Sequence, residues 1–360
     1  MPTRLPQLDG LRGVAILLVI LHNQSPMYPS LHLENLFANG WMGVDLFFVL
    51  SGFLITGILV DTKHSEGYLK NFYARRCLRI WPLYYSLLFF MFIVVPFMHP
   101  SMGQTVFDKS SPWWAYPLFL QNFLVPARGA GPLNVTWSLA IEEQFYLVWP
   151  WVVQYCSSAQ VRRIAIAVIC ASPVLRLLLS FGQVDLYRNV FCRLDGLMAG
   201  ALLALLARSD SFVPARYVRR AWIVFFVAVP LAFVTVAIDA WWLVFSVAAL
   251  ASAALVYLSL YAEQAVLQRA LTNRFMVYTG MISYGLYLLH KIPFDMAKTL
   301  QLDRYPLLAV PILLAACYGV AVVSWHLLEK PCLRLKWHFE SQAVSPALRP
   351  GHLIARGVNR

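Results

Sequence analysis

The sequence predicts an all-α fold, a polytopic membrane helix bundle with about ten transmembrane helices. Hydrophobic residues make up 60% of the 360 residues, charged residues make up only 13%, and the mean hydropathy is +0.63. Apolar stretches close to the length that crosses a bilayer, about 20 residues, recur along the chain. This composition excludes an ordinary soluble globular domain.

The expected spans follow one another along the sequence. They cover about residues 13–22, 41–60, 80–98, 137–156, 164–180, 189–207, 221–238, 241–260, 275–290 and 306–328. The stretch 113–125, WWAYPLFLQNFLV, is short and interrupted by proline, so we expect a re-entrant or interfacial segment within a long loop. We expect one membrane domain over residues 1–335 and a disordered, basic tail over residues 336–360.

The distribution of Lys and Arg predicts the orientation of the bundle. Most of these 29 residues fall at the chain ends and in alternate connections, which predicts that both termini are cytoplasmic and that the loop 99–136 lies outside. The net charge of +12 fits this topology and anionic membrane lipids, so we expect no nucleic-acid partner. The six cysteines form no CxxC pair and indicate reduced, buried thiols, so we expect no metal site.

Charged residues inside spans need a partner, a water-filled cavity or a function. Arg12 and His22 are ten residues apart, about 15 Å along a helix, so His22 lies deep in the membrane if Arg12 is at the cytoplasmic surface. A snorkelling arginine and a hydrogen-bonded histidine of the bundle explain the pair equally well. Asp45, one turn into the second span, either favours the helix N-terminus electrostatically or orients His22 from a neighbouring helix.

Further charges lie in the third and fourth spans. Arg76 and Arg79 are three residues apart and share a helix face, where they can form a fork for phosphate or carboxylate, with Arg75 beside them. Ordinary positive-inside charge is the alternative explanation. Glu142 lies close to the lipid zone and either balances an arginine or holds an acceptor hydroxyl.

The remaining buried charges favour a structural role. Arg176, Arg193 and Asp195 are expected to form buried ion pairs with one another. The sequence contains no GxSxG elbow, P-loop or HExxH motif, so any catalysis must use residues within the membrane.

Six ordered stretches resemble the acyltransferase 3 family of integral membrane O-acyltransferases. They are LPQLDGLRGVAILLVILHN, GVDLFFVLSGFLIT, RRCLRIWPLYY, TWSLAIEEQFYLVWP, ISYGLYLLH and EKP, and the resemblance runs from residue 5 to about 335. It implies a ten-helix domain that moves an acyl group, often acetyl from acetyl-CoA, onto a hydroxyl of an extracytoplasmic glycan or another acceptor.

The resemblance also implies roles for individual residues. The first-helix basic residue and histidine of the family, its arginine pair and its glutamate fall on Arg12, His22, Arg76, Arg79 and Glu142. The family usually has ten residues between the basic residue and the histidine, whereas this chain has nine. The shorter spacing leaves the two side chains about 80° apart around the helix instead of about 20°. Either a local distortion restores the geometry, or Arg12 is not the functional equivalent.

We therefore expect an O-acetyltransferase of the cell inner membrane that uses acetyl-CoA or another acyl-CoA from the cytoplasm. Its expected acceptor is an extracytoplasmic saccharide, such as an exopolysaccharide or lipopolysaccharide precursor. His22 acts as the base or is itself acylated, Asp45 orients it, and Glu142 positions the acceptor or balances a cation. The residues expected to bind CoA phosphates are Arg12, Arg75, Arg76 and Arg79. The alternative function is a transporter or flippase of lipid-linked sugars, which also needs intramembrane charges.

Overall fold

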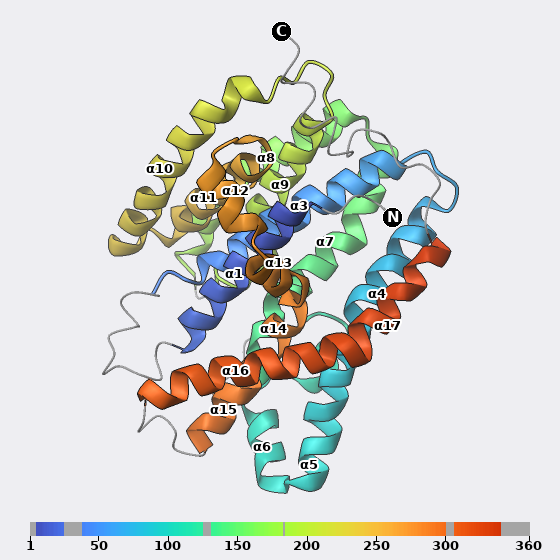
Figure 1. Ribbon diagram of the computed structural model, residues 1–360, viewed down its shortest axis with the longest axis vertical. Helices are drawn as coiled ribbons and strands as arrows, with labels where there is room; N and C mark the ends of the chain where they lie inside the picture. Colours follow the sequence, from blue (N-terminus) through green and yellow to red (C-terminus); the bar gives the residue numbers. More distant parts are fainter. Residues whose placement is uncertain (1–4, 25–37, 125–130, 183, 300–305, 340–360) are drawn as a thin grey trace.

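The computed structural model describes residues 5–24, 38–124, 131–182, 184–299 and 306–339, and these residues form a bundle of helices (Figure 1). Within these ranges, five helices are long and apolar enough to cross a membrane. They are Met42–Thr62, Tyr68–Met98, Ala215–Ala237, Trp241–Tyr261 and Leu308–Phe339. The predicted class, a polytopic helical membrane bundle, is confirmed, but the count of ten spans is not.

The first half of the chain builds the helices that surround the candidate site. These are α1 (Pro6–Gln24), α3 (Met42–Thr62), α4 (Tyr68–Phe89), α7 (Thr136–Tyr155), α8 (Ser158–Leu179) and α9 (Leu194–Ala207). After α4 the chain continues through π-helical η3 (Phe90–Val94), α5 (Val95–Met98) and α6 (Pro100–Asp108), and α5 and α6 form a hairpin at one end of the bundle (Figure 1).

The described part of the expected re-entrant segment, residues 113–124, contains only the short 3-10 turn η4 (Trp113–Ala115), and a second such turn, η5 (Pro132–Val135), leads into α7. Gln121 is buried and donates a hydrogen bond to the Thr136 carbonyl over 3.0 Å. Tyr84 of α4 donates to the Tyr116 carbonyl over 2.8 Å. Irregular backbone is thus tolerated here because hydrogen bonds with α4 and with the start of α7 satisfy polar groups of the segment.

The second half of the chain contains long outer helices and several short ones. The elements are η6 (Val190–Cys192), α10 (Ala215–Ala237), α11 (Trp241–Tyr261), α12 (Ala265–Thr272), α13 (Arg274–Met281), α14 (Ser283–Leu289), α15 (Lys291–Thr299), α16 (Pro306–Ser324), η8 (Trp325–Glu329), α17 (Lys330–Arg334) and η9 (Leu335–Phe339). The expected span 275–290 is two helices, because the backbone leaves helical geometry at Ile282 with φ −93° and ψ 7°. The predicted tail is described only for residues 336–339, which belong to η9.

Glycines allow α1 to pack closely against its neighbours. A Cβ on Gly280 of α13 would lie 1.7 Å from the carbonyl oxygen of Asp9 on α1, and a Cβ on Gly43 of α3 would lie 2.4 Å from the carbonyl oxygen of Ala15. Small residues at such crossings let helix backbones approach each other within a membrane. The position and rotation of α1 are therefore fixed on two sides, and with them the directions of its polar side chains.

Candidate active site

A cavity of about 90 Å³ lies where α1, α3, α4, α7 and α14 converge. We name it the arginine cavity, because Arg12, Arg76 and Arg79 line it. Glu142 also lines it, so the structure brings together four of the residues selected from the sequence. The other polar residues of its wall are Ser51, Ser138, Tyr146, Ser283, Tyr284 and Tyr287.

Hydroxyl groups from two helices hold Glu142. Ser51 of α3 donates a hydrogen bond to Glu142 Oε1 over 2.5 Å, and the Tyr146 hydroxyl donates to Ser51 Oγ over 3.3 Å. The guanidinium carbon of Arg76 lies 5.8 Å from the centroid of the Tyr146 ring. The carboxylate and the cation are thus positioned by the same tyrosine, which follows Glu142 by one helical turn.

Cations from three parts of the chain converge around this cavity. Arg12 lies 4.0 Å from Asp9, and among the described residues Arg76 Nε has no hydrogen-bond partner. Arg75 lines a separate small groove, which Arg76 also lines. Lys336 of η9, a segment that packs against α4, lies within electrostatic reach of these arginines. Such a set of cations suits the binding of phosphate or carboxylate groups.

A second cavity of about 820 Å³ contains His22 and Asn23, which lie near the end of α1. We name it the aromatic cavity, because its wall includes Trp41, Trp137, Tyr187, Trp241, Trp242 and Phe245. Arg12 lines the arginine cavity and His22 lines the aromatic cavity, so one helix directs the two side chains into different spaces. Helix α1 is α-helical from Pro6 to Gln24, and no local distortion restores the usual spacing.

Val44 and Tyr287 separate the two cavities, because both residues line both of them. We name this pair the partition. The Tyr287 hydroxyl lies 2.5 Å from Ser138 Oγ and donates a hydrogen bond to the Val135 carbonyl over 2.9 Å. The Tyr287 ring also contacts the Phe47 ring edge to face, with centroids 6.1 Å apart. A group that moves from one cavity to the other must therefore pass the Tyr287 side chain.

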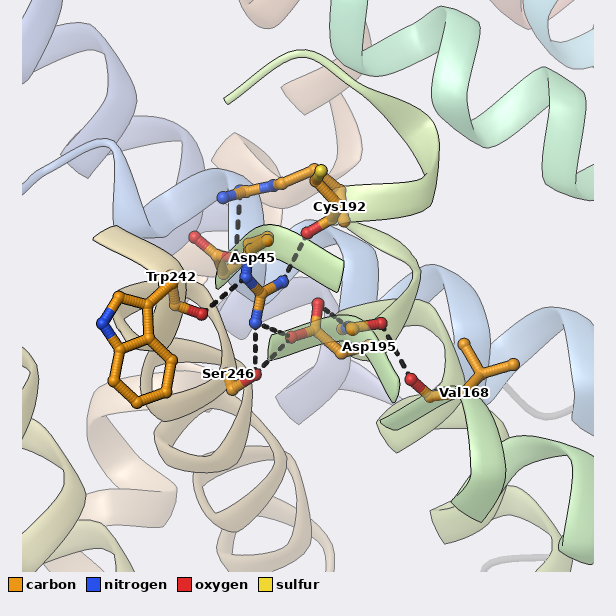
Figure 2. A network of polar contacts seen from close by, with 10 residues as sticks. Asp45, Val168, Cys192, Asp195, Trp242 and Ser246 are labelled. Atoms are coloured by element: carbon orange, nitrogen blue, oxygen red, sulfur yellow. Dashed lines mark hydrogen bonds and ion pairs between the residues drawn. The ribbon is translucent and has the colours of Figure 1, made fainter. Parts of the chain in front are cut away.

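Two buried ion pairs lie beside the aromatic cavity (Figure 2). Arg176 Nη2 lies 2.9 Å from Asp195 Oδ2, and Ser246 Oγ donates to the same oxygen over 2.7 Å. The expected ion pairing is confirmed for Arg176 and Asp195. Arg193 pairs instead with Asp45, with 3.0 Å between Nη2 and Oδ1.

Aromatic rings enclose the guanidinium group of Arg193. Its Cζ lies 4.0 to 5.8 Å from the ring centroids of Phe48, Trp137, Tyr187 and Phe245. Most of these rings also line the aromatic cavity, so the Asp45–Arg193 pair supports the wall of that cavity from behind. The orientation of His22 by Asp45 stays a prediction.

The sequence did not single out Tyr287 or Trp241 as site residues. Tyr287 lies in the ISYGLYLLH stretch, so its membership of a family motif was an available signal. Trp241 begins α11, where a tryptophan is ordinarily an interfacial anchor, so no local signal distinguished it. Within the described ranges, no group of three or more His, Cys, Asp or Glu side chains is placed to hold a metal ion.

Comparison with known proteins matches residues 5–326 to the model of a protein family described as an acyltransferase domain. The peptidoglycan O-acetyltransferase OatA of Listeria monocytogenes is 39% identical over 158 residues, which are 40% of this chain and 23% of that protein. The putative peptidoglycan O-acetyltransferase YrhL of Bacillus subtilis is 33% identical over 219 residues, 56% of this chain and 33% of that protein.

A third relative, the O-acetyltransferase OatA of Staphylococcus aureus, is 31% identical over 164 residues, which are 43% of this chain and 25% of that protein. The chain thus spans a third or less of the length of these relatives. No solved structure matches the chain.

Proposed function

The chain belongs to the acyltransferase family whose model it matches over residues 5–326, and we propose on this premise that it is a membrane O-acetyltransferase. Its donor is acetyl-CoA or another acyl-CoA, and its acceptor is a hydroxyl group of a cell-wall glycan or another extracytoplasmic saccharide. The observation that carries the proposal is the meeting of a cationic cavity and an aromatic cavity at one partition. The printed names of the relatives, peptidoglycan O-acetyltransferases, support the choice of acceptor.

The donor binds at the arginine cavity. A space of about 90 Å³ accommodates a small acyl group but not a nucleotide, so the CoA phosphates lie at its cationic mouth. Arg76 and the neighbouring Arg79, which both line the cavity and are only partly buried, supply directional donors for these phosphates. In the predicted orientation the protein lies in the cell inner membrane with both termini in the cytoplasm. The mouth of the arginine cavity then faces the cytoplasm, where acyl-CoA is available.

Transfer breaks the C–S bond of the thioester and forms the C–O bond of an ester. In a direct route, His22 accepts the proton of the acceptor hydroxyl, the hydroxyl oxygen attacks the thioester carbonyl, and the CoA thiolate leaves and is protonated. In a two-step route, a ring nitrogen of His22 attacks the thioester carbonyl and the CoA thiolate leaves and is protonated. The acceptor hydroxyl then attacks the acylated imidazole, loses its proton and releases neutral His22. Both routes require the acyl group to pass the partition, because His22 lines the aromatic cavity.

Glu142 acts on the donor side of the partition. It lines the arginine cavity and accepts a hydrogen bond from Ser51, and it does not line the aromatic cavity. Of the two roles considered for this carboxylate, the placement favours the balancing of arginine charge over the holding of an acceptor hydroxyl.

The proposal is tested by measuring the affinity for labelled acetyl-CoA and the rate of acetyl transfer with purified protein. Removal of a charged hydrogen-bonding group costs about 1.5–3 kcal/mol, so Arg76→Ala is expected to weaken donor affinity about 10- to 100-fold and to leave the acceptor KM unchanged. His22→Ala is expected to lower kcat by about 10²- to 10⁴-fold without changing donor affinity.

Arg163→Ala is the matched control, because Arg163 is an exposed arginine of α8 that lines neither cavity. It is expected to match the wild type in donor affinity and in rate. Absence of both acetyl-CoA binding and acetyl transfer from the wild-type protein, together with movement of labelled lipid-linked sugars across vesicles, overturns the proposal in favour of a flippase.

A further inference from the structure

The two cavities differ sharply in the charge of the residues that line them. The charged residues that line the arginine cavity are three arginines and one carboxylate, Glu142. The described wall of the aromatic cavity contains two carboxylates, Asp185 and Asp239, and no lysine or arginine. Among the described residues of this wall, His22 is therefore the only side chain that can carry a positive charge toward a ligand.

Two arginines beside this wall are paired with carboxylates. Arg188 Nη1 lies 3.6 Å from Asp185 Oδ2, and Arg193 pairs with Asp45 at 3.0 Å. Among the described residues, an anionic ligand would find a positive partner only in a protonated His22 or by breaking one of these pairs. Buried anions are costly without a positive partner, so the cavity discriminates against carboxylated or phosphorylated ligands.

Trp241 is the most exposed aromatic side chain among the residues that line the cavity. Trp241 is 38% exposed, whereas Trp41, Trp137 and Phe245 are at most 6% exposed. The Trp241 ring contacts the Trp41 ring, with centroids 6.2 Å apart and an angle of 46° between the planes. This contact restricts the side-chain motion of Trp241. A partly exposed indole that is held by a neighbouring ring offers a ligand a flat apolar surface, and its binding costs little conformational entropy.

Polar side chains stand around this surface. Asn39, Asn134 and Ser180 line the cavity with the two aspartates, and its volume of about 820 Å³ lies within the range of about 300–1,000 Å³ that is typical of small-molecule sites. A pyranose ring has one apolar C–H face and a rim of hydroxyls. That combination matches an exposed indole surrounded by hydrogen-bonding groups.

We propose that the aromatic cavity is the acceptor site and that it selects an uncharged or cationic glycan, whose acceptor pyranose packs on Trp241. The proposal rests on the function proposed above and narrows its substrate class, because it excludes glycans that carry a uronate or a phosphate on the acceptor unit. The acceptor hydroxyl then faces His22, while the acyl-CoA is held on the far side of Val44 and Tyr287.

The test measures the binding of three oligosaccharides to the purified full chain by titration calorimetry. The probes are N-acetylchitotetraose, which is neutral, chitotetraose, which is cationic, and tetragalacturonate, which is anionic. We expect the neutral and cationic probes to bind and the anionic probe to bind at least about tenfold more weakly. Trp241→Ala is expected to weaken binding of the neutral probe about tenfold or more, and Trp241→Phe is expected to weaken it less.

Two further variants sharpen the test. Trp113→Ala is the matched control, because Trp113 is 60% exposed but lies outside the aromatic cavity, and it is expected to bind the probes as the wild type does. Asp185→Asn releases Arg188 from its partner, so the affinity for tetragalacturonate is expected to rise relative to the neutral probe.

Three results overturn the acceptor assignment: no binding of any oligosaccharide, preferred binding of the anionic probe, or binding that Trp241→Ala leaves unchanged. Acetyl-CoA binding and hydrolysis are measured on the same samples. If they persist while sugar binding fails, only the acceptor site is refuted, whereas their loss in the wild-type protein refutes the proposed function.

Discussion

Asp45→Asn separates a structural role of this carboxylate from a catalytic one. The substitution keeps the shape of the side chain and removes its charge, and it leaves the Arg193 guanidinium, 1% exposed, without its partner at 3.0 Å. If Asp45 acts through Arg193, the loss is a loss of stability. If Asp45 orients His22, the loss is a loss of catalytic rate in protein that is still folded.

The expected magnitude follows from the burial of the pair. Neutralising one partner of a buried ion pair costs about 3–5 kcal/mol, because the other charge stays buried without compensation. Arg193 keeps its aromatic contacts, including Phe245 at 4.0 Å, and such cation–π contacts are worth about 0.5–2 kcal/mol. We therefore expect Asp45→Asn to lower the free energy of unfolding by about 3 kcal/mol, near the bottom of that range.

The double variant Asp45→Asn/Arg193→Gln removes both charges and leaves two amides that can hydrogen-bond to each other. It is expected to recover most of the lost stability. The wild type, the single variants Asp45→Asn and Arg193→Gln, and the double variant form a double-mutant cycle. Asp61→Asn is the matched control, because its partner Arg208 lies 2.6 Å away but the two side chains are 9–11% exposed. Its cost is expected to be smaller, about 1 kcal/mol.

Two measurements decide between the roles: denaturant-induced unfolding in detergent micelles, and acetyl transfer per folded molecule. We expect the double variant to transfer acetyl groups within about tenfold of the wild-type rate once it is folded. A stable double variant whose transfer rate is more than about 100-fold lower refutes this reasoning, because loss of a carboxylate that orients a catalytic histidine lowers rates by up to about 10⁴-fold.

Three other substitutions test the site and the packing that holds it. Glu142→Gln removes a negative charge beside the arginines, so it is expected to strengthen binding of the anionic donor by less than about tenfold and to lower the transfer rate, both measured with labelled acetyl-CoA. A change only in acceptor KM would place its role on the other side of the partition. Tyr287→Ala is expected to join the two cavities and to raise the ratio of CoA released to ester formed, because water then reaches the thioester. Tyr287→Phe is expected to keep the wild-type ratio. An unchanged ratio in the alanine variant argues against a partition. Gly280→Ala places a Cβ 1.7 Å from the Asp9 carbonyl oxygen and is expected to lower the free energy of unfolding by at least about 1–3 kcal/mol. The loss is measured as a lower monodisperse yield in size-exclusion chromatography. Gly319→Ala, whose Cβ would have no heavy atom within 4 Å, is the control and is expected to leave the yield unchanged.

The helical class was predictable because hydropathy reports directly on which segments can lie in lipid. The expected spans 41–60, 137–156 and 241–260 differ from α3, α7 and α11 by no more than two residues at either end. The break at Ile282 was not predictable, because the 275–290 stretch is mostly apolar and hydropathy does not report backbone geometry. The early start of α4 at Tyr68 was missed for the opposite reason, since its first turns are polar.

The charged residues of the arginine cavity were predictable one by one, but their grouping was not. Arg76 and Arg79 share a face within one helix, so their proximity follows from spacing alone. The contact of Glu142 with Ser51 joins residues 91 positions apart, and it depends on how α7 packs against α3. The pairing of Arg193 with Asp45 also depends on how helices pack, because the two residues are far apart in the sequence. Proximity in the sequence favoured Asp195 as the partner of Arg193, and that prediction was wrong.

The nine-residue gap between Arg12 and His22 gains a physical explanation from the two cavities. Residues that act on one ligand group must share a face, but the side chains of Arg12 and His22 enter different cavities. A rotation of about 80° around α1 is then compatible with both proposed roles, because the sites proposed for the donor phosphates and for the acceptor hydroxyl lie on opposite sides of the partition. Helix α1 forms part of both cavity walls, and its close packing at Gly280 resists the rotation that would bring Arg12 and His22 to one face.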